Sequence, residues 1–367
     1  MNERDAAALV ADLVGDRAGE WDRAGRLPGD VLAELAGKGV LCAEVPAEHG
    51  GLGLSSVDNG ELTAAVGALC GSLRSLLTSH GMAAWTLSRF GNAEQRATHL
   101  PRLTSGALAG VAFSEPGAGS DLSAMATTIV RDGRSVVVSG RKVWVTGAAY
   151  ADLLVVFGRH GDGAAIVVVP ANAPGVRIDR VPEPVGCRAA GHADVHLDAV
   201  RLPADLLLGG AGLPVTLLAT AALGYGRLSV AWGCVGILRA CLAATTRHAT
   251  TREQFGVPIA EHQLVARHLA ELHVAERSAT HTCAHASRCW DAGTPETVEA
   301  TLLAKHLAAT TAARGAAAAL QVMGSAGAHD GHPVARAYRD AKLMEIIEGS
   351  AEICQLALAK HAIAEWT

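Results

Sequence analysis

The sequence has few aromatic residues and no cluster of basic ones, and both absences narrow its function. Aromatic residues make up 4% of the 367 positions, whereas half of all residues are hydrophobic. Ala, Leu and Val therefore supply the interior, which favours closely packed helices. The net charge is -5 and the pI about 6.3, so we expect neither a nucleic acid nor a membrane as the principal partner.

Paired cysteines, a leader segment and long apolar runs are also lacking. The eight cysteines are scattered and form no CxxC pair, which is typical of a reduced, cytosolic protein. The first residues, MNERD, are followed by no apolar signal segment. No run approaches the roughly eighteen apolar residues of a membrane span. We therefore expect a cytoplasmic protein.

The pattern of apolar residues divides the chain into three parts. Residues 1–107 carry helical spacing, with helices predicted over 5–21, 28–39 and 56–90. Residues 108–210 carry short β-branched runs separated by glycines, which predict a middle domain made of an antiparallel sheet or barrel.

Residues 211–367 return to a helical pattern. The Ala-rich segments fall at about 215–250, 258–291, 295–324 and 333–364. Four such segments predict an up-and-down four-helix bundle. The fold class is therefore α+β and mainly helical: an N-terminal helical domain, a middle β domain and a C-terminal bundle.

Glu348 is the candidate catalytic residue. It lies between Ile346-Ile347 and Gly349-Ser350, where Gly-Ser is typical of a helix start. Burial disfavours the charged carboxylate, so we expect a raised pKa, which suits a base working near neutral pH. Taken alone, a partly exposed glutamate before a helix is the simpler interpretation.

Three further segments point to a bound ligand, although each also has a structural interpretation. Residues 113–121, FSEPGAGSD, form a glycine-rich turn that lets backbone N–H groups approach a ligand. Residues 142–147, KVWVTG, place Trp144 and Thr146 on one face of a strand, where they could hold a flat heteroaromatic ring. In residues 251–263, TREQFGVPIAEHQ, Arg252 could bind a phosphate and Phe255 could stack on a base.

Together with Glu348, these segments resemble the acyl-CoA dehydrogenase family, flavoenzymes that oxidise acyl thioesters. The resemblance covers nearly the whole chain, and it implies the three domains above with FAD between the β domain and the bundle. It makes Glu348 the base that removes a proton while a hydride leaves for flavin N5. It also implies a homodimer or homotetramer, because some FAD contacts come from a neighbouring subunit.

The resemblance assigns further roles by motif position. The implied FAD contacts of the chain's own subunit are Phe113, Ser114, Ser120, Trp144, Thr146, Ser350 and Glu352. The implied contacts to a neighbour's FAD are Arg252, Phe255, Gln263, Gln321, Gly324 and Ser325. The implied substrate contacts are Tyr225, Arg227, Ile347 and Gly349.

Departures from the family pattern bear on the substrate. The chain has Gly226 beside Arg227, where the family commonly has an acidic residue that holds the pantetheine of CoA. Ile347 replaces a frequent tyrosine. The stretch 186–194, GCRAAGHAD, and residues 225–227 are similar to the acyl-carrier-protein-linked dehydrogenases of methoxymalonyl extender-unit biosynthesis. That kinship implies a three-carbon hydroxyacyl thioester whose aldehyde is oxidised to give hydroxymalonyl thioester.

Several alternatives remain at this stage. They are α,β-dehydrogenation of a short-chain acyl-CoA, a flavin oxidase on the same scaffold, and a DNA-binding branch, which the charge balance disfavours. The electron acceptor is unknown. A metal site is a further alternative, because His281, His285 and Cys289 recur every four residues on one helix face, with Cys283 nearby. No acidic ligand accompanies them in the sequence, and packing is the simpler interpretation, so we expect no metal.

Overall fold

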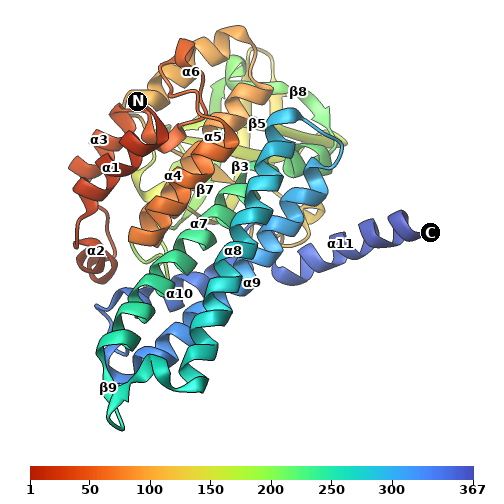
Figure 1. The fold of residues 1–367 in the computed structure, drawn as a ribbon. Coiled ribbons are helices and arrows are strands. Elements are labelled where there is room, and N and C mark those ends of the chain that lie inside the picture. Colours follow the sequence, from red (N-terminus) through yellow and green to blue (C-terminus); the bar gives the residue numbers. More distant parts are fainter.

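The computed structural model describes residues 1–367, apart from the side chains of residues 210, 211, 216 and 219. Helices at both ends of the chain flank a β domain (Figure 1). The predicted fold class is confirmed: N-terminal helices, a middle sheet and a helical bundle follow one another along the chain.

The N-terminal part has more and shorter helices than the sequence predicts. They are α1 Glu3–Val14, α2 Ala18–Ala24, α3 Gly29–Gly37, α4 Ser56–Leu69, α5 Gly71–Phe90 and α6 Ala93–Thr104. The helix predicted over 5–21 is broken at Gly15, whose φ of +50° is accessible to glycine at little cost. The helix predicted over 56–90 is broken at Cys70, which has extended backbone and caps α5 through its thiol.

The middle domain is one eight-stranded sheet. Its strands are β1 Ala109–Ala112, β2 Thr128–Asp132, β3 Ser135–Val145, β4 Leu153–His160, β5 Gly163–Pro170, β6 Val176–Arg180, β7 Ala193–Pro203 and β8 Leu207–Leu213. The order is β6-β7-β3-β2-β4-β5-β8, with β1 beside β4. The sheet is mainly antiparallel as predicted, but β4 pairs in parallel with β1 and β2.

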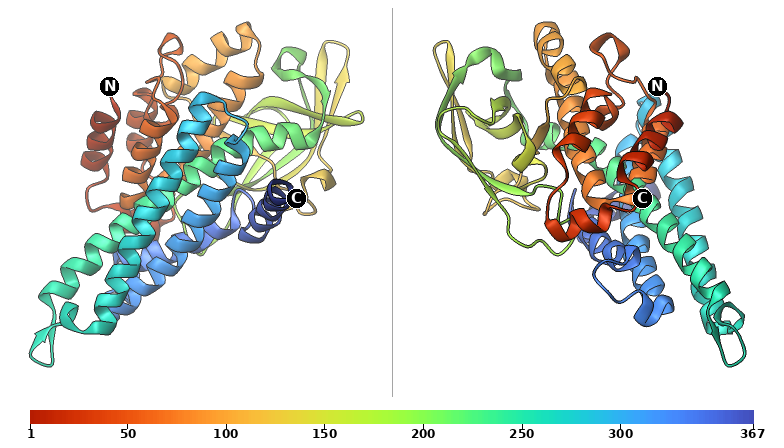
Figure 2. Two further views of the ribbon diagram at one scale, coloured as in Figure 1. Left: turned by 45° about the vertical axis from the view of Figure 1, so that its right-hand side comes forward. Right: turned by 90° about the vertical axis from the view of Figure 1, so that its left-hand side faces the viewer.

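The C-terminal part begins with the long helix α7 Val215–Thr251, which packs against α4, α8 and α9. The remaining helices are α8 Gln263–Ala292, α9 Thr297–Met323, α10 Pro333–Ile346 and α11 Ala351–Trp366. The last segment predicted as one bundle element is therefore two helices, separated at residues 347–350. α11 projects away from the bundle (Figures 1 and 2).

One stretch of α7, Thr220–Thr251, is long and apolar enough to cross a membrane by length and composition alone. The sequence indicated no such span, because short polar interruptions divide the run. Since 72% of the most apolar window is buried inside the protein, this stretch has the environment of a core helix in a bundle.

The three parts share cores and polar contacts. The Tyr150 hydroxyl, in the β domain, accepts from Leu27 N–H at 2.9 Å and donates to the Ala189 carbonyl at 2.8 Å. Asp340 of α10 accepts from Cys187 N–H at 2.6 Å, which ties the loop before β7 to the bundle. The N-terminal helices, the sheet and the bundle are therefore fixed relative to one another around the central helices α5 and α7.

Candidate functional site

Glu348 lies in the short link between α10 and α11. Its φ is +55° and that of Gly349 is +87°, so two consecutive residues are left-handed, which costs about 1–3 kcal/mol at the glutamate. Neighbouring cations hold the link in place. Arg227 Nε donates to the Glu348 carbonyl at 3.3 Å, and the buried Lys305 ammonium donates to the Gly349 carbonyl.

Glu348 is half-buried, and its carboxylate oxygen Oε2 is enclosed against α7. Its Oε2 has no hydrogen-bond partner among the described residues. It faces Gly226, where an added Cβ would lie 2.3 Å from Oε2. Burial raises the pKa of Glu348 to about 7, although Arg227, Lys305 and Arg74 lower it in part. The expected raised pKa is confirmed, and the group can accept a proton near neutral pH.

Trp144 and Thr146 meet at His192 rather than on a regular strand face. β3 has a register irregularity between Lys142 and Val145, and Trp144 has a φ of +56°. The predicted two-residue alternation is therefore wrong in detail. The Trp144 ring lies 5.7 Å from the His192 ring, and the Thr146 hydroxyl lies 3.2 Å from His192 Nδ1. Burial, then the charge of Arg74, lowers the His192 pKa to about 4, so its ring is neutral at pH 7.

Helix α5 connects these groups with Glu348. The Ser79 hydroxyl donates to the Thr146 carbonyl at 2.8 Å. One turn later, Met82 approaches Gly226, where a Cβ would lie 2.4 Å from the Met82 methyl group. The same glycine position faces the Glu348 carboxylate. Thr146 and Glu348 therefore border neighbouring turns of one helix.

The predicted glycine-rich turn is held by a buried ion pair. Lys142 Nζ lies 2.7 Å from Glu115 Oε1 and donates to the Phe113 carbonyl at 2.9 Å. Burial would raise the Glu115 pKa, but hydrogen bonds from Lys142, Thr127 and Ala126 outweigh it, and the pKa is lowered. Phe113 stacks on Phe157 with ring centroids 4.0 Å apart.

The serines of this turn differ in their surroundings. The Ser114 carbonyl accepts from Val143 N–H at 2.9 Å, which fastens the turn to β3. Ser120 is exposed. Only the first of the two is fixed by the sheet, and Ser120 remains open to a ligand.

The residues predicted to reach a neighbour's FAD do not join this site within one chain. Arg252, Phe255 and Gln263 are exposed on the hairpin formed by β9 Glu253–Gln254 and β10 Val257–Pro258 and on the start of α8. This hairpin is the tip of the bundle, away from the sheet (Figure 1). Gln321, Gly324 and Ser325 are also exposed, where α9 ends.

The substrate residues fall on both sides of Glu348. Arg227 donates to the Glu348 carbonyl, and the Gly349 carbonyl accepts from Lys305. Ile347 packs against the bundle core. The Tyr225 hydroxyl is buried and accepts from Asn59 at 3.3 Å. The two remaining predicted FAD contacts begin α11: Ser350 caps it by accepting from Ile353 N–H, and Glu352 is exposed.

Asn59 also contacts a second carboxylate, that of Glu44, which was not predicted from the sequence. Asn59 donates to Glu44 Oε1 at 2.8 Å. Burial raises the Glu44 pKa to about 7, against the hydrogen bond from Asn59. Glu44, Asn59, Tyr225 and Ser229 line a small hollow between α4 and α7. Nothing in the local sequence distinguishes Glu44 or Lys305, because their burial depends on distant segments.

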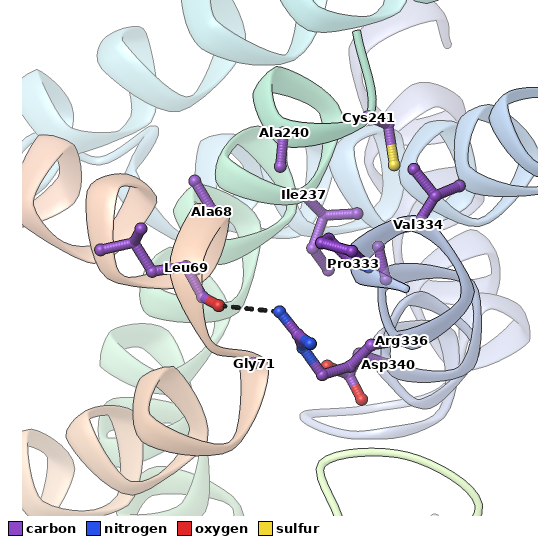
Figure 3. A pocket seen from close by; sticks show the side chains of 12 residues that line it. Ala68, Leu69, Gly71, Ile237, Ala240, Cys241, Pro333, Val334, Arg336 and Asp340 are labelled. Atoms are coloured by element: carbon purple, nitrogen blue, oxygen red, sulfur yellow. Dashed lines mark hydrogen bonds between the residues drawn. The ribbon is translucent and has the colours of Figure 1, made fainter. Parts of the chain in front are cut away.

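A larger hollow of about 340 Å³ contains none of the predicted site residues. It lies between α4, α7 and α10, and Figure 3 shows Arg336 donating to the Leu69 carbonyl across it. Asp340 at its edge also binds the Cys187 N–H. These polar side chains fasten structural elements, so we assign the hollow no role in the chemistry.

The metal alternative requires one correction. An acidic residue does accompany the helix-face ligands: Glu296 lies with His285 and Cys289, their ligand atoms within 4.8 Å of one another. His281 is not part of this group. Glu296 is the N-cap of α9, and no sequence pattern predicts that this turn folds back onto α8.

Family models for acyl-CoA dehydrogenases match nearly the whole chain. The N-terminal domain matches residues 1–107, the middle domain residues 110–200 and the C-terminal domain residues 212–363. The probable acyl-CoA dehydrogenase YngJ of Bacillus subtilis (strain 168) is 34% identical over 360 residues, covering 95% of this chain and 94% of its own. The mitochondrial short-chain specific acyl-CoA dehydrogenase of Bos taurus is 32% identical over 356 residues, covering 95% of this chain and 86% of its own.

A solved structure is more similar. FkbI, described as serving biosynthesis of the methoxymalonyl extender unit of the Fk520 polyketide, is 62% identical. The alignment covers 98% of this chain and 99% of that one, with a TM-score of 0.94.

Proposed function

Because this chain belongs to the acyl-CoA dehydrogenase family, whose members use FAD, we propose that it oxidises a short acyl thioester carried on an acyl carrier protein. The substrate we propose is a three-carbon hydroxyacyl thioester with an aldehyde terminus, and the product is the hydroxymalonyl thioester. The 62% identity with FkbI supports this substrate class. The Glu348 carboxylate, whose enclosed Oε2 has no partner among the described residues, carries the chemistry.

The described residues fit a flavin. Trp144 exposes 52% of its surface beside the neutral ring of His192, although an indole is normally buried. We assign the flavin ring to the region between Trp144, Thr146 and Phe113, and its phosphates to the turn at Ser120. When bound, FAD supplies the two-electron oxidant.

Glu348 acts on the substrate as a base. In the hydrated aldehyde it takes the proton from oxygen while the hydride leaves the same carbon. The Glu348 N–H makes no hydrogen bond to any described residue, so it is available to donate to the thioester carbonyl. A donor aimed at an oxygen where negative charge develops lowers the barrier.

The exposed hairpin supports a homo-oligomer. Phe255 exposes 96% of its surface at the tip of the bundle, away from the Glu348 site of its own chain (Figure 1). We propose that Arg252, Phe255 and Gln263 bind the FAD of a second copy. Sedimentation of the FAD-loaded protein should give a dimer or larger; a monomer that keeps its flavin would overturn this part. We also propose a cytoplasmic location, which suits eight buried free thiols.

The activity is tested with FAD-loaded wild type and Glu348→Gln. The aldehyde thioester is presented on carrier protein and on CoA, and flavin bleaching and the mass of the acyl group are recorded. We expect the acyl group to gain one oxygen, with carrier protein preferred, and Glu348→Gln to lose at least about 10³-fold in rate while staying yellow. Loss of two hydrogens from butyryl-CoA, with no reaction of the aldehyde, would instead assign ordinary α,β-dehydrogenation; peroxide release under air would reveal an oxidase.

A further inference from the structure

Three side chains that can bind a metal ion meet at the turn between α8 and α9. His285 and Cys289 lie one turn apart near the end of α8, and Glu296 is the N-cap of α9. One ligand atom of each residue lies within 4.8 Å of the other two. The group is separate from the residues assigned to the flavin and the acyl thioester.

The spacing of the sulfur and nitrogen ligands fits zinc. Cys289 Sγ lies 3.7 Å from His285 Nε2. In zinc sites the Zn–S distance is about 2.3 Å and the Zn–N distance about 2.0–2.1 Å, so two such ligands of a tetrahedral ion stand about 3.6 Å apart. One zinc ion can therefore bind both atoms without a change in the helix.

The Glu296 carboxylate supplies an oxygen ligand. An acidic N-cap normally accepts hydrogen bonds from the first N–H groups of its own helix, but the Glu296 side chain makes no capping hydrogen bond. A carboxylate oxygen lies instead within 4.8 Å of the sulfur and the imidazole nitrogen on α8. The three ligands thus come from both helices.

Backbone hydrogen bonds fix the turn that carries these ligands. Gly293, with a φ of +60°, ends α8, and its N–H donates to the carbonyls of Cys289 and Trp290. The Cys289 carbonyl also accepts from the Thr294 N–H at 3.1 Å and from the Thr297 hydroxyl at 2.9 Å. The start of α9 is therefore bound to the last turn of α8, which reduces the ordering that an ion would have to impose.

We propose that His285, Cys289 and Glu296 bind one zinc ion, with water as the fourth ligand. Thiolate and imidazole favour zinc over magnesium and calcium, which prefer oxygen ligands. Cys289 is 6% exposed, whereas His285 and Glu296 are exposed, so the sulfur ligand lies on the protein side and the water faces solvent. On binding, the Cys289 thiol releases its proton to solvent, and nothing is oxidised.

The position of the turn gives the ion a structural role. The ring of Trp290, one residue after the sulfur ligand, lies 5.3 Å from the Trp85 ring of α5 and 6.5 Å from the Tyr225 ring of α7. Asp291 accepts from the Ser56 N–H at the start of α4 at 2.9 Å. The turn contacts three other helices, and zinc stabilises the point where they meet. This role is independent of the oxidation proposed above.

Zinc binding to the FAD-loaded enzyme, freed of metal with a chelator, tests the proposal. Titration calorimetry with zinc chloride should give one ion per chain and a dissociation constant of about 1 μM or below. X-ray absorption at the zinc edge should show one sulfur neighbour at about 2.3 Å and nitrogen or oxygen neighbours at about 2.0–2.2 Å. The thermal midpoint should rise with zinc, because a ligand that binds only the folded state stabilises it.

Variants assign the ion to these residues. Cys289→Ala, His285→Ala and Glu296→Gln should each weaken zinc binding at least about 100-fold, because even groups outside the ligand shell contribute about 10–100-fold. His281→Ala is the matched control: His281 is exposed on the same face of α8, one turn earlier, and lies outside the group. This variant should bind zinc as wild type does.

Flavin content and the thermal midpoint without zinc report whether the variants fold. If Cys289→Ala does not fold, the variants of the exposed His285 and Glu296 decide. The inference is overturned if wild type binds no zinc, or if the absorption spectrum shows no sulfur neighbour. Equal affinity in wild type and the ligand variants would also overturn it, because the chain has 16 histidines and zinc would then be bound adventitiously elsewhere.

Discussion

At the scale of single residues, the site depends on one carboxylate oxygen, Glu348 Oε2, that is enclosed without a hydrogen-bond partner among the described residues. Glu348 has a raised pKa because burial disfavours its charge. Its Oε2 has no partner among the described residues, and its backbone is left-handed. The surrounding cations Arg227 and Lys305 bind carbonyls of the link rather than the carboxylate itself. The proton affinity of the base is therefore set mainly by desolvation.

The pH dependence of activity follows from this pKa. A base must be deprotonated, so kcat/KM should rise with pH and level off above a pKa near 7. Initial rates from pH 5.5 to 8.5 measure it. Glu44 is the necessary control, because burial raises its pKa to about 7 as well. The Glu44→Gln variant should show the same rise of kcat/KM with pH. If the rise is absent in this variant, the titrating group is Glu44 and not Glu348.

Stability should depend on pH in the opposite sense. The folded pKa of Glu348 is about 7, whereas its ordinary value is 4.5, so the folded state binds more protons than the unfolded state between these pH values. The stabilisation of the folded state by this protonation is fully present below pH 4.5. It is lost as the pH rises through 7, which lowers the free energy of unfolding by roughly 3 kcal/mol in total. Urea unfolding at pH 5 and pH 8 should show that Glu348→Gln gains stability relative to wild type at the higher pH. An unchanged difference would contradict the assignment.

A side chain at Gly226 should displace the Glu348 carboxylate from its position. A Cβ there would lie 2.3 Å from Glu348 Oε2 and 2.4 Å from the Met82 methyl group. Since a displacement of about 1 Å can cost about 10²-fold, Gly226→Ala should reduce turnover by roughly that factor with flavin still bound. Gly37→Ala in α3, which would meet nothing within 4 Å, is the control and should leave turnover intact. Normal turnover in Gly226→Ala would show that the carboxylate does not need this space.

Single residues were predictable from sequence only where a motif marked them. Glu348, Trp144 and Thr146 lie in short runs with recognisable spacing. Arg74, Lys305 and Glu44 were not predicted, because a lone charged residue is normally exposed. Their burial comes from segments far away in the chain: Arg74 meets Met344, and Lys305 meets Gly349.

At the scale of elements, the glycine-rich turn is attached to β3 by a pair of charges. Lys142 and Glu115 are both buried. Removing one partner leaves the other uncompensated, so Lys142→Met should lower the free energy of unfolding by about 3–5 kcal/mol. Urea denaturation measures the change. The double variant Lys142→Met/Glu115→Gln should recover part of the loss, and equal instability of the two variants would count against the pair.

Elements were predicted well where the pattern was regular and less well where it was interrupted. The helices α7, α8 and α9 begin and end within about five residues of expectation because their Ala-rich runs are long, whereas the segment predicted over 333–364 is divided into α10 and α11. The breaks at Gly15 and Cys70 were missed, since neither residue excludes a helix. The bulge at Trp144 was missed because β3 had to be treated as regular without its partner β7.

At the scale of the whole molecule, polar contacts between buried groups help to join the three parts. The Tyr150 hydroxyl accepts a hydrogen bond from the Leu27 N–H and donates one to the Ala189 carbonyl. Tyr150→Phe leaves both partners unsatisfied and should cost about 1–3 kcal/mol in the free energy of unfolding. Tyr338→Phe, at a half-exposed position, should change it by less than about 0.5 kcal/mol. Equal effects would show that the Tyr150 hydroxyl does not link the domains.

The placement of the β9–β10 hairpin has a consequence for handling the protein. If Phe255 and Arg252 bind the FAD of another copy, the fraction of enzyme that keeps its FAD depends on the enzyme concentration. The reason is that dissociation of the subunits exposes the flavin to solvent. A dilute sample would bleach by losing its prosthetic group while every chain stayed folded. Assays at nanomolar enzyme would then understate the specific activity unless free FAD were supplied.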